Sequence, residues 1–194
     1  MLPLAEAQVE TKDELDGRSD VELIAAINHG DARAFEVLYF RYRDWVVGLA
    51  YRFTGDDDTS LDVLQETFLY LLRKFPGFRL TAQMKTFLYP AVRNLSIAAR
   101  RKGQRYQGGE AEQRELERTA APESPSGRSE TIAAVLAAVP QEQREVLLLR
   151  FVDGLSLAEI AEAMQTPLGT VKSRLHNALA DLRQDPRTKE FFAP

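Results

Sequence analysis

The chain contains no cysteine, and only two of its 194 residues are histidines, His29 and His176. Without cysteine it can form neither disulfides nor thiolate metal sites, and two histidines leave little for a zinc centre or a catalytic triad. No stretch approaches the roughly 18 consecutive apolar residues of a membrane span. The N-terminal residues lack the basic start and apolar run of a secretion signal. We therefore expect a cytoplasmic protein that is not an enzyme, holds no metal or other cofactor and does not insert into a membrane.

Charge is unevenly distributed along the sequence. The total of 25 basic and 29 acidic side chains gives a net charge of −4, which is unusual for a protein that binds nucleic acid. Between Phe78 and Arg105, however, acidic residues are absent, and the basic ones are Arg79, Lys85, Arg93, Arg100, Arg101, Lys102 and Arg105. Further upstream, residues 56–66 include no basic residue, and their acidic ones are Asp56, Asp57, Asp58, Asp62 and Glu66. This segregation is more informative about partners than the net charge.

Apolar residues recur every three or four positions through most of the chain, which predicts an all-α fold. Capping residues, glycines and prolines mark where the helices begin and end. The first four helices are expected over Ser19–His29, Asp31–Gly55, Thr59 or Ser60 to Pro76, and about Thr86 to Lys102. Pro90 is expected to delay or bend the fourth of these helices. The third is expected to have an inward face of Leu61, Leu64, Phe68, Leu71, Leu72 and Phe75.

The same patterning predicts two small helical domains joined by a flexible linker. Residues 103–128 are rich in glycine, proline, serine and mixed charge and have no sustained apolar stripe, which is typical of a linker. Residues 1–18 and 186–194 are expected to be tails, with order beginning at Ser19. The two domains are therefore expected to span residues 19–102 and 129–185.

The second domain carries a predicted helix-turn-helix. Ser156 and Glu159 have the spacing of a capping box, and after a break at Gln165 we expect Thr166 to cap a last helix that starts at Pro167. A helix-turn-helix presents the exposed face of its second helix to the DNA major groove. Basic side chains there suit phosphates and guanine, and hydroxyl and amide groups suit base edges. An ordinary helical hairpin with a solvated polar face is the alternative. The residues facing outward include Thr170, Lys172, Ser173, Arg174, His176 and Asn177.

The third helix has a polar outer face on which Asp62, Gln65, Glu66 and Leu69 are spaced by three and four residues. Carboxylates beside an exposed leucine suit docking on a basic helix of a partner protein. A merely solvated face is the alternative from spacing alone. A metal site built from Asp56, Asp57, Asp58 and Asp62 is a third interpretation.

In the basic segment, Phe78, Phe87 and Tyr89 are interleaved with the charges. Aromatic rings can stack on unpaired bases while lysine and arginine follow the backbone, so the segment suits single-stranded DNA. The alternative is that these aromatic residues belong to the core.

Three segments, in this order, resemble the extracytoplasmic-function (ECF) sigma factors of bacterial RNA polymerase: DVLQETFLYLL, TFLYPAVRNLSIAARR and AVPQEQREVLLLRFVDGLSLAEIAEAMQTPLGTVKSRLHNAL. The resemblance covers about Ser19 to Arg183. It implies an initiation factor that brings core polymerase to promoter DNA, recognises two promoter elements and melts the downstream one. An anti-sigma factor is a further candidate partner. The rival hypothesis is a stand-alone helix-turn-helix regulator that does not dock on polymerase.

The resemblance also implies roles for individual residues. Phe87 lies where the family usually has tryptophan, Asn94 matches its characteristic asparagine, and the loop from Phe78 to Lys85 lies where a flipped base is captured. Asn177 and Pro90 depart from the family pattern. The implied polymerase-binding residues are Asp62, Gln65, Glu66 and Phe68, to which the outer face adds Leu69. The expected DNA-binding residues are Phe78, Arg79, Lys85, Phe87, Arg93, Asn94, Thr170, Lys172, Ser173, Arg174, His176 and Asn177.

Overall fold

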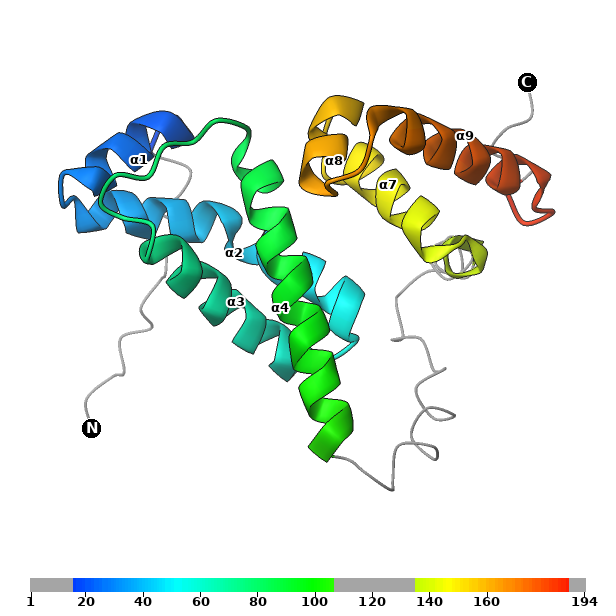
Figure 1. Cartoon of the computed structure of the whole chain (residues 1–194), viewed down its shortest axis with the longest axis horizontal. Helices are drawn as coiled ribbons and strands as arrows, with labels where there is room; N and C mark the ends of the chain where they lie inside the picture. Colours follow the sequence, from blue (N-terminus) through cyan, green and yellow to red (C-terminus); the bar gives the residue numbers. More distant parts are fainter. Residues whose placement is uncertain (1–15, 107–134, 189–194) are drawn as a thin grey trace, which may run out of the picture. The chain divides into compact units, whose positions relative to one another are not determined.

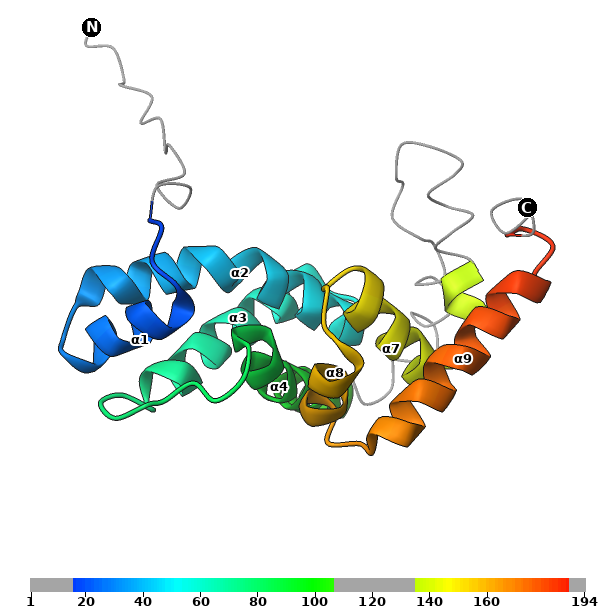
Figure 2. The same cartoon turned by 90° about the horizontal axis from the view of Figure 1, so that it is seen from above.

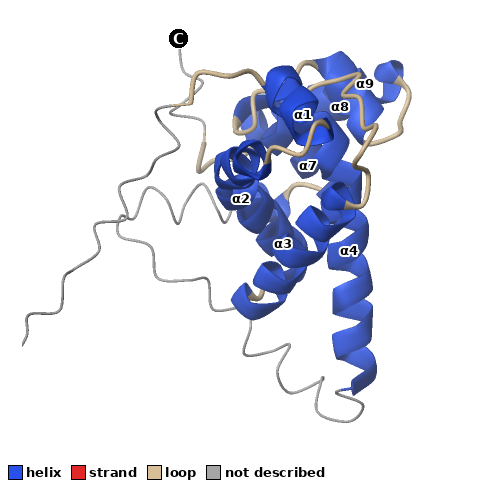
Figure 3. Ribbon diagram, turned by 90° about the vertical axis from the view of Figure 1, so that its left-hand side faces the viewer, coloured by secondary structure: helices blue, strands red, loops and turns tan. Residues whose placement is uncertain are grey.

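The computed structural model of the chain describes residues 16–106 and 135–188. The chain divides into two compact units between residues 100 and 101. Within the described ranges the regular structure consists of helices alone (Figure 3). The prediction of an all-α chain with two helical domains is therefore confirmed. The rest of the predicted tails and linker, residues 1–15, 107–128 and 189–194, lies outside the described residues.

The first two helices begin and end where local chemistry predicts. Helix α1 (Asp20–Asn28) opens with a capping box, in which the Ser19 backbone N–H donates to the Glu22 carboxylate (2.7 Å). Helix α2 (Ala32–Thr54) begins with Asp31, whose carboxylate accepts from the Ala34 N–H (3.1 Å). It ends at Gly55, which has a left-handed φ of 66°. Each cap satisfies a backbone group that has no partner inside its helix.

Helix α3 (Asp57–Leu72) starts before the predicted Thr59 or Ser60, because Asp56 caps it by accepting from the Thr59 N–H (2.8 Å). The predicted inward orientation of Leu61 and Leu72 is wrong, since these side chains are 48% and 47% exposed. Leu61 lies one turn before Gln65, and so belongs to the outer face. The buried face of α3 comprises Val63, Leu64, Thr67, Phe68 and Leu71.

Helix α4 (Met84–Tyr106) extends beyond both predicted ends. Pro90 lies inside it rather than near its start, so the expected delay is wrong. Proline has no N–H, and the helix therefore lacks the bond that residue 90 would donate to the Thr86 carbonyl. Side chains join α4 to both neighbours: Phe87 stacks on Tyr70 of α3, and Lys85 lies over the Trp45 ring of α2. Figures 1 and 2 show α2 and α3 side by side, with α4 across them.

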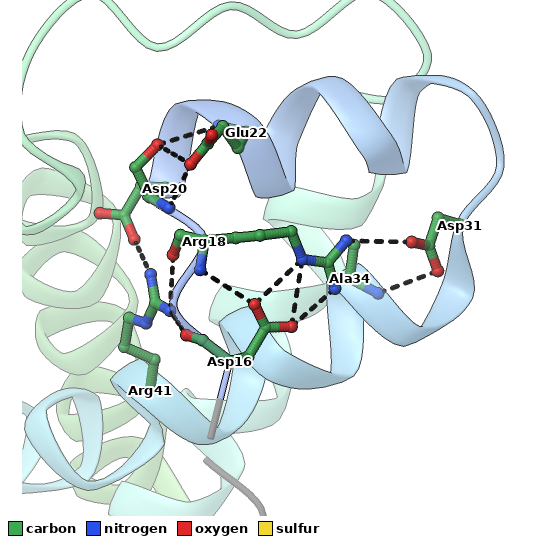
Figure 4. A network of polar contacts seen from close by, with 8 residues as sticks. Asp16, Arg18, Asp20, Glu22, Asp31, Ala34 and Arg41 are labelled. Atoms are coloured by element: carbon green, nitrogen blue, oxygen red, sulfur yellow. Dashed lines mark hydrogen bonds and ion pairs between the residues drawn. The ribbon is translucent and has the colours of Figure 1, made fainter. Parts of the chain in front are cut away.

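A network of charged side chains fixes the chain just before α1 (Figure 4). Arg41 of α2 binds the Asp20 carboxylate (2.8 Å) and donates to the carbonyls of Asp16 (3.3 Å) and Arg18 (2.9 Å). Arg18 in turn bridges Asp16 and Asp31. Its hydrogen bonds lower the pKa of Asp16 to about 2. Order therefore begins before Ser19, contrary to the sequence-based expectation.

We expect Arg41→Ala to destabilise the first unit by about 2 kcal/mol, because the half-buried Asp20 carboxylate and two carbonyls lose a charged donor. The fluorescence of Trp45, the only tryptophan, reports on this unit during urea unfolding. Arg43→Ala is the matched control. Its pair with the 86% exposed Asp44 contributes about 0.5 kcal/mol. Equal losses in the two variants would contradict the structural role of the network.

The second unit contains α7 (Gln141–Phe151), α8 (Leu157–Ala163) and α9 (Leu168–Gln184), preceded by helical residues 135–138. Helices α7 and α8 both pack on α9. The predicted capping box is confirmed, because the Ser156 N–H donates to Glu159 (2.8 Å) and the Glu159 N–H donates to Ser156 Oγ (3.3 Å). A cluster in the core comprises Val139, Leu147 and Ala178, with Leu136, Leu175, Leu179 and Leu182 packed against it.

The turn between α8 and α9 forms the predicted helix-turn-helix with one correction. Pro167, and not Thr166, is the capping residue, and α9 starts at Leu168. The Thr166 hydroxyl instead donates to the Met164 carbonyl (3.1 Å). The extended conformation of Pro167 directs its carbonyl into the helix, where it accepts from the Val171 N–H (3.1 Å).

Among the described helices, none is both long and apolar enough to cross a bilayer.

Candidate nucleic-acid and protein interfaces

The outer face of α3 is both acidic and apolar. Asp62, Gln65 and Glu66 are exposed, as sequence spacing predicts, and they lie beside Leu69, which is 43% exposed. Leu61 and Leu72 extend the same face toward the two ends of the helix. We call these six residues the α3 face: Leu61, Asp62, Gln65, Glu66, Leu69 and Leu72. Exposed leucines grouped on one helix face are typical of a surface that binds another protein.

Phe68 lies beneath this face and not on it. Its side chain is only 5% exposed and packs edge-on against Tyr39 (4.8 Å between ring centroids) and Phe35 (6.3 Å) of α2. It therefore joins α3 to α2 and sets the orientation of the α3 face. Phe68 therefore exposes very little side-chain surface for direct contact with a partner.

A second surface forms where the loop between α3 and α4, residues 73–83, meets the two helices. Phe87 of α4 lies between Phe78 (4.7 Å between centroids) and Tyr70 of α3 (6.2 Å, nearly parallel), and Phe75 packs edge-on against Phe78 (5.5 Å). We call Tyr70, Phe75, Phe78 and Phe87 the aromatic cluster. Tyr70 is 37% exposed, Phe78 and Phe87 are half-buried, and Lys74 lies over the Tyr70 ring (4.6 Å). The cluster thus offers aromatic surface beside a positive charge.

The sequence pattern identifies Phe78 and Phe87 but not Tyr70, Lys74 and Phe75, because the basic segment begins only at Phe78. The alternation of aromatic and basic residues in YLLRKFPGF begins eight residues earlier and could have identified them. Tyr89, by contrast, is completely buried, so the core interpretation is correct for this ring.

The loop and α4, which carry Phe78 and Phe87, also carry the polar residues expected to contact melted DNA. Arg79, Arg93 and Asn94 are exposed, and Lys85 is half-buried near Trp45. Asn94 follows Phe87 by two helical turns, and therefore lies on the same side of α4. The structure thus gathers hydrogen-bonding and cationic groups along the helix that carries Phe87.

In α9, four of the residues expected to contact DNA are exposed. These are Lys172, Ser173, His176 and Asn177, while Thr170 is half-buried. Arg174 differs, because its side chain is only 21% exposed and forms an ion pair with Glu142 of α7. Sequence reasoning missed Glu142, which is 32 residues away along the chain and has no local signature.

Three of the four aspartates considered for a metal site stabilise the start of α3. Asp56 caps α3, and Asp57 and Asp58 lie in the first turn, where negative charge stabilises the helix dipole. Across residues 16–106 and 135–188, no three histidine, aspartate or glutamate side chains are grouped to hold a metal ion.

The two units thus define an α-helical protein in which one unit carries the α3 face and the aromatic cluster and the other carries a helix-turn-helix. Residues 38–106 match the family model of sigma-70 region 2, and residues 129–182 match that of sigma-70 region 4. The RNA polymerase sigma-H factor of Pseudomonas aeruginosa is 33% identical over 172 residues, or 82% of this chain and 89% of the relative. The ECF RNA polymerase sigma-E factor of Haemophilus influenzae is 32% identical and is covered over 91% of its length, against 82% of this chain. The chain belongs to the ECF sigma factors of the sigma-70 family.

Two solved structures have the same fold. CnrH in complex with the cytosolic domain of CnrY gives a TM-score of 0.61 at 23% identity, over 84% of this chain and 93% of that one. RpoE from Bartonella quintana, in complex with the anti-sigma factor NepR, gives 0.60 at 21% identity, over 79% and 96%. With regions 2 and 4 both matched, the protein is a sigma factor that directs RNA polymerase to promoters. A stand-alone helix-turn-helix regulator is not favoured.

Proposed function

We propose that this sigma factor acts in the cytoplasm by binding alone, without turnover, through three separate surfaces. The first surface binds core polymerase, the second binds the melted strand of the downstream promoter element, and the third reads the upstream element as a duplex. The observation that supports this division best is that α3, α4 and the loop between them carry two different surfaces. The acidic, leucine-rich α3 face and the aromatic cluster beside basic residues suit two chemically different partners.

The α3 face is the proposed polymerase-binding surface. Asp62, Glu66 and Gln65 would orient a basic helix of the polymerase, and Leu69 with Leu61 and Leu72 would add apolar area. Charge complementarity sets the orientation and speed of association, and buried leucines provide much of the affinity. Phe68 contributes by fixing α3 on α2.

The aromatic cluster is the proposed site for the melted strand. Stacking a base on an aromatic ring contributes about 1–3 kcal/mol, which offsets the few kcal/mol of extracting that base from the duplex. Phe87 and Phe78 would supply the rings, and Asn94 a base-edge contact. The basic side chains proposed to follow the DNA backbone are Arg79, Lys85 and Arg93.

The exposed side of α9 is the proposed reader of duplex DNA. Lys172 suits a phosphate or guanine, and Ser173, His176 and Asn177 suit base edges or the backbone. Arg174 would contact DNA only after leaving Glu142. While paired it fixes α9 on α7, and Thr170 lies half-buried near the start of the helix.

For Lys172→Ala we expect duplex binding to weaken about equally for all sequences. The slope of log K against the logarithm of the salt concentration should become shallower by about one, because one phosphate contact is lost. Fluorescence anisotropy of a labelled promoter duplex between 50 and 300 mM salt would measure both effects. Arg187→Ala removes the same charge from an exposed side chain beyond the end of α9, where it pairs with Asp185, and should leave the salt dependence unchanged. A sequence-selective loss in Lys172→Ala would instead assign it to base reading.

An anti-sigma factor is a further proposed partner, because one solved structure of similar fold is a complex with an anti-sigma factor, and another is a complex with a domain of a second protein. Co-purification of the full chain with candidate regulators from its own genome would identify one.

Run-off transcription tests the proposal as a whole. The full chain, added to core polymerase and a pool of genomic fragments, should produce transcripts with defined starts. Sequencing their upstream regions should show two elements separated by a constant spacing. Transcripts that do not depend on the added chain would contradict the proposed function.

A further inference from the structure

One side chain of α1 attaches to the loop between α3 and α4. The Asn28 carboxamide oxygen accepts from the backbone N–H groups of Gly77 (2.6 Å) and Phe78 (3.2 Å), and its nitrogen donates to the Phe78 carbonyl (2.8 Å). Asn28 is the last residue of α1, and it lies 50 positions before Phe78 in the sequence. Figure 1 shows the loop passing beside this end of α1.

The geometry of these bonds is specific to an amide side chain. Gly77 has a φ of 100°, a conformation that glycine adopts readily and that directs two successive N–H groups toward one oxygen. The group that meets them must accept on one atom and donate on the other, as asparagine does. A carboxylate would still accept twice but would face the Phe78 carbonyl with like partial charge.

Helix α1, which ends at Asn28, is fixed to α2 at its first residue. Asp20, at the start of α1, is bound by Arg41 and by the Tyr42 hydroxyl, both from α2 (Figure 4 shows Asp20 and Arg41). Burial and the bond to Asp20 raise the pKa of Tyr42, so this hydroxyl keeps its proton over the physiological range. Helix α1 therefore connects the loop firmly to α2.

We infer that Asn28 is a positioning residue for capture of a melted base, an inference that rests on the proposed role of the aromatic cluster. By holding Gly77 and the Phe78 backbone, it sets the Phe78 ring against Phe87 before DNA arrives. A loop ordered in advance does not lose that conformational entropy on binding. Asn28 acts through the loop and does not itself need to touch DNA.

The first test follows the anchor without any partner. In the 15N-labelled full chain, amide exchange at Gly77 and Phe78 should become about tenfold faster in Asn28→Ala, because both N–H groups lose their acceptor. In Asn28→Asp the acceptors remain, and a smaller increase is expected. His29→Ala is the matched control, since the side chain of this exposed neighbour bonds the Ala25 carbonyl of its own helix and not the loop. Unchanged amide exchange at Gly77 and Phe78 in Asn28→Ala would show that Asn28 does not hold the loop.

The second test separates positioning from a general loss of folded protein. Holoenzymes reconstituted with each variant would be assayed on a promoter found by run-off transcription and on versions carrying each of the four bases at each position of the melted element. We expect Asn28→Ala to open the preferred sequence about tenfold less and to discriminate less among bases, with unchanged affinity for core polymerase. Asn28→Asp should fall between Asn28→Ala and the wild type.

Wild-type discrimination among the four bases in Asn28→Ala would overturn the inference. If promoter opening also fell by the same factor for all four bases, Asn28 would have a purely structural role. Failure of the wild-type chain to initiate anywhere would instead remove the proposed function and the base-capture role with it. The exchange measurement would still decide whether Asn28 holds the loop.

Discussion

Reversing the charges of the α3 face is expected to abolish recruitment of core polymerase. In Asp62→Lys with Glu66→Lys, two exposed carboxylates near the middle of α3 become cations that face the proposed basic partner. Like charges brought together across an interface cost several kcal/mol, and about 4 kcal/mol corresponds to about a thousandfold weaker binding. Adding Gln65→Lys should weaken binding further. Because all three side chains point to solvent, the fold should persist.

Surface-immobilised core polymerase would measure the affinity of each variant, and run-off transcription the consequence. Glu36→Lys with Asp44→Lys is the matched control, because it changes the net charge equally at exposed positions of α2 in the same unit. The control should bind within about threefold of the wild type, since its charges lie on α2 and not on the α3 face. If the α3 variant still initiated transcription from a cognate promoter, polymerase docking would have to be assigned to another surface.

Much of the fold was predictable because helix boundaries depend on neighbouring residues. The capping boxes at Ser19 and Ser156 and the stop at Gly55 each follow from a few adjacent side chains. The predicted inward orientation of Leu61 and Leu72 is wrong because it rests on hydrophobicity alone. Their register with Gln65 and Leu69 places them outside, and this register was available from the sequence.

The details of the sites depend on contacts between distant residues, which no local pattern reveals. The Arg174 guanidinium was expected to face DNA, but Glu142 lies 32 positions away and holds it on α7. Asn28 and Gly77 are 49 positions apart, and neither has an unusual neighbourhood in the sequence. The types of side chain at each surface could thus be predicted, whereas the bonds that orient them could not.

The second large effect concerns Phe87, for which the sequence left core packing and base contact open. Its ring is half-buried between Phe78 and Tyr70, a position that serves either role. Phe87→Leu distinguishes them, because leucine keeps most of the apolar volume but has no aromatic face. We expect a stability loss of about 1 kcal/mol in this variant, typical of a swap that nearly conserves volume. Loss of stacking should reduce promoter opening by about 2 kcal/mol, or about thirtyfold.

Permanganate footprinting of open complexes, at concentrations that saturate core polymerase with each variant, would measure the opening. Phe87→Trp retains an aromatic face and should open the promoter at least as well as the wild type. Phe35→Leu is the control, because this half-buried ring packs on Phe68 and not on the aromatic cluster. Its opening should match the wild type despite a similar loss of stability. Normal opening by Phe87→Leu would show that the ring serves only to support α4, and the melted strand would then have to stack on Phe78 or Tyr70 instead.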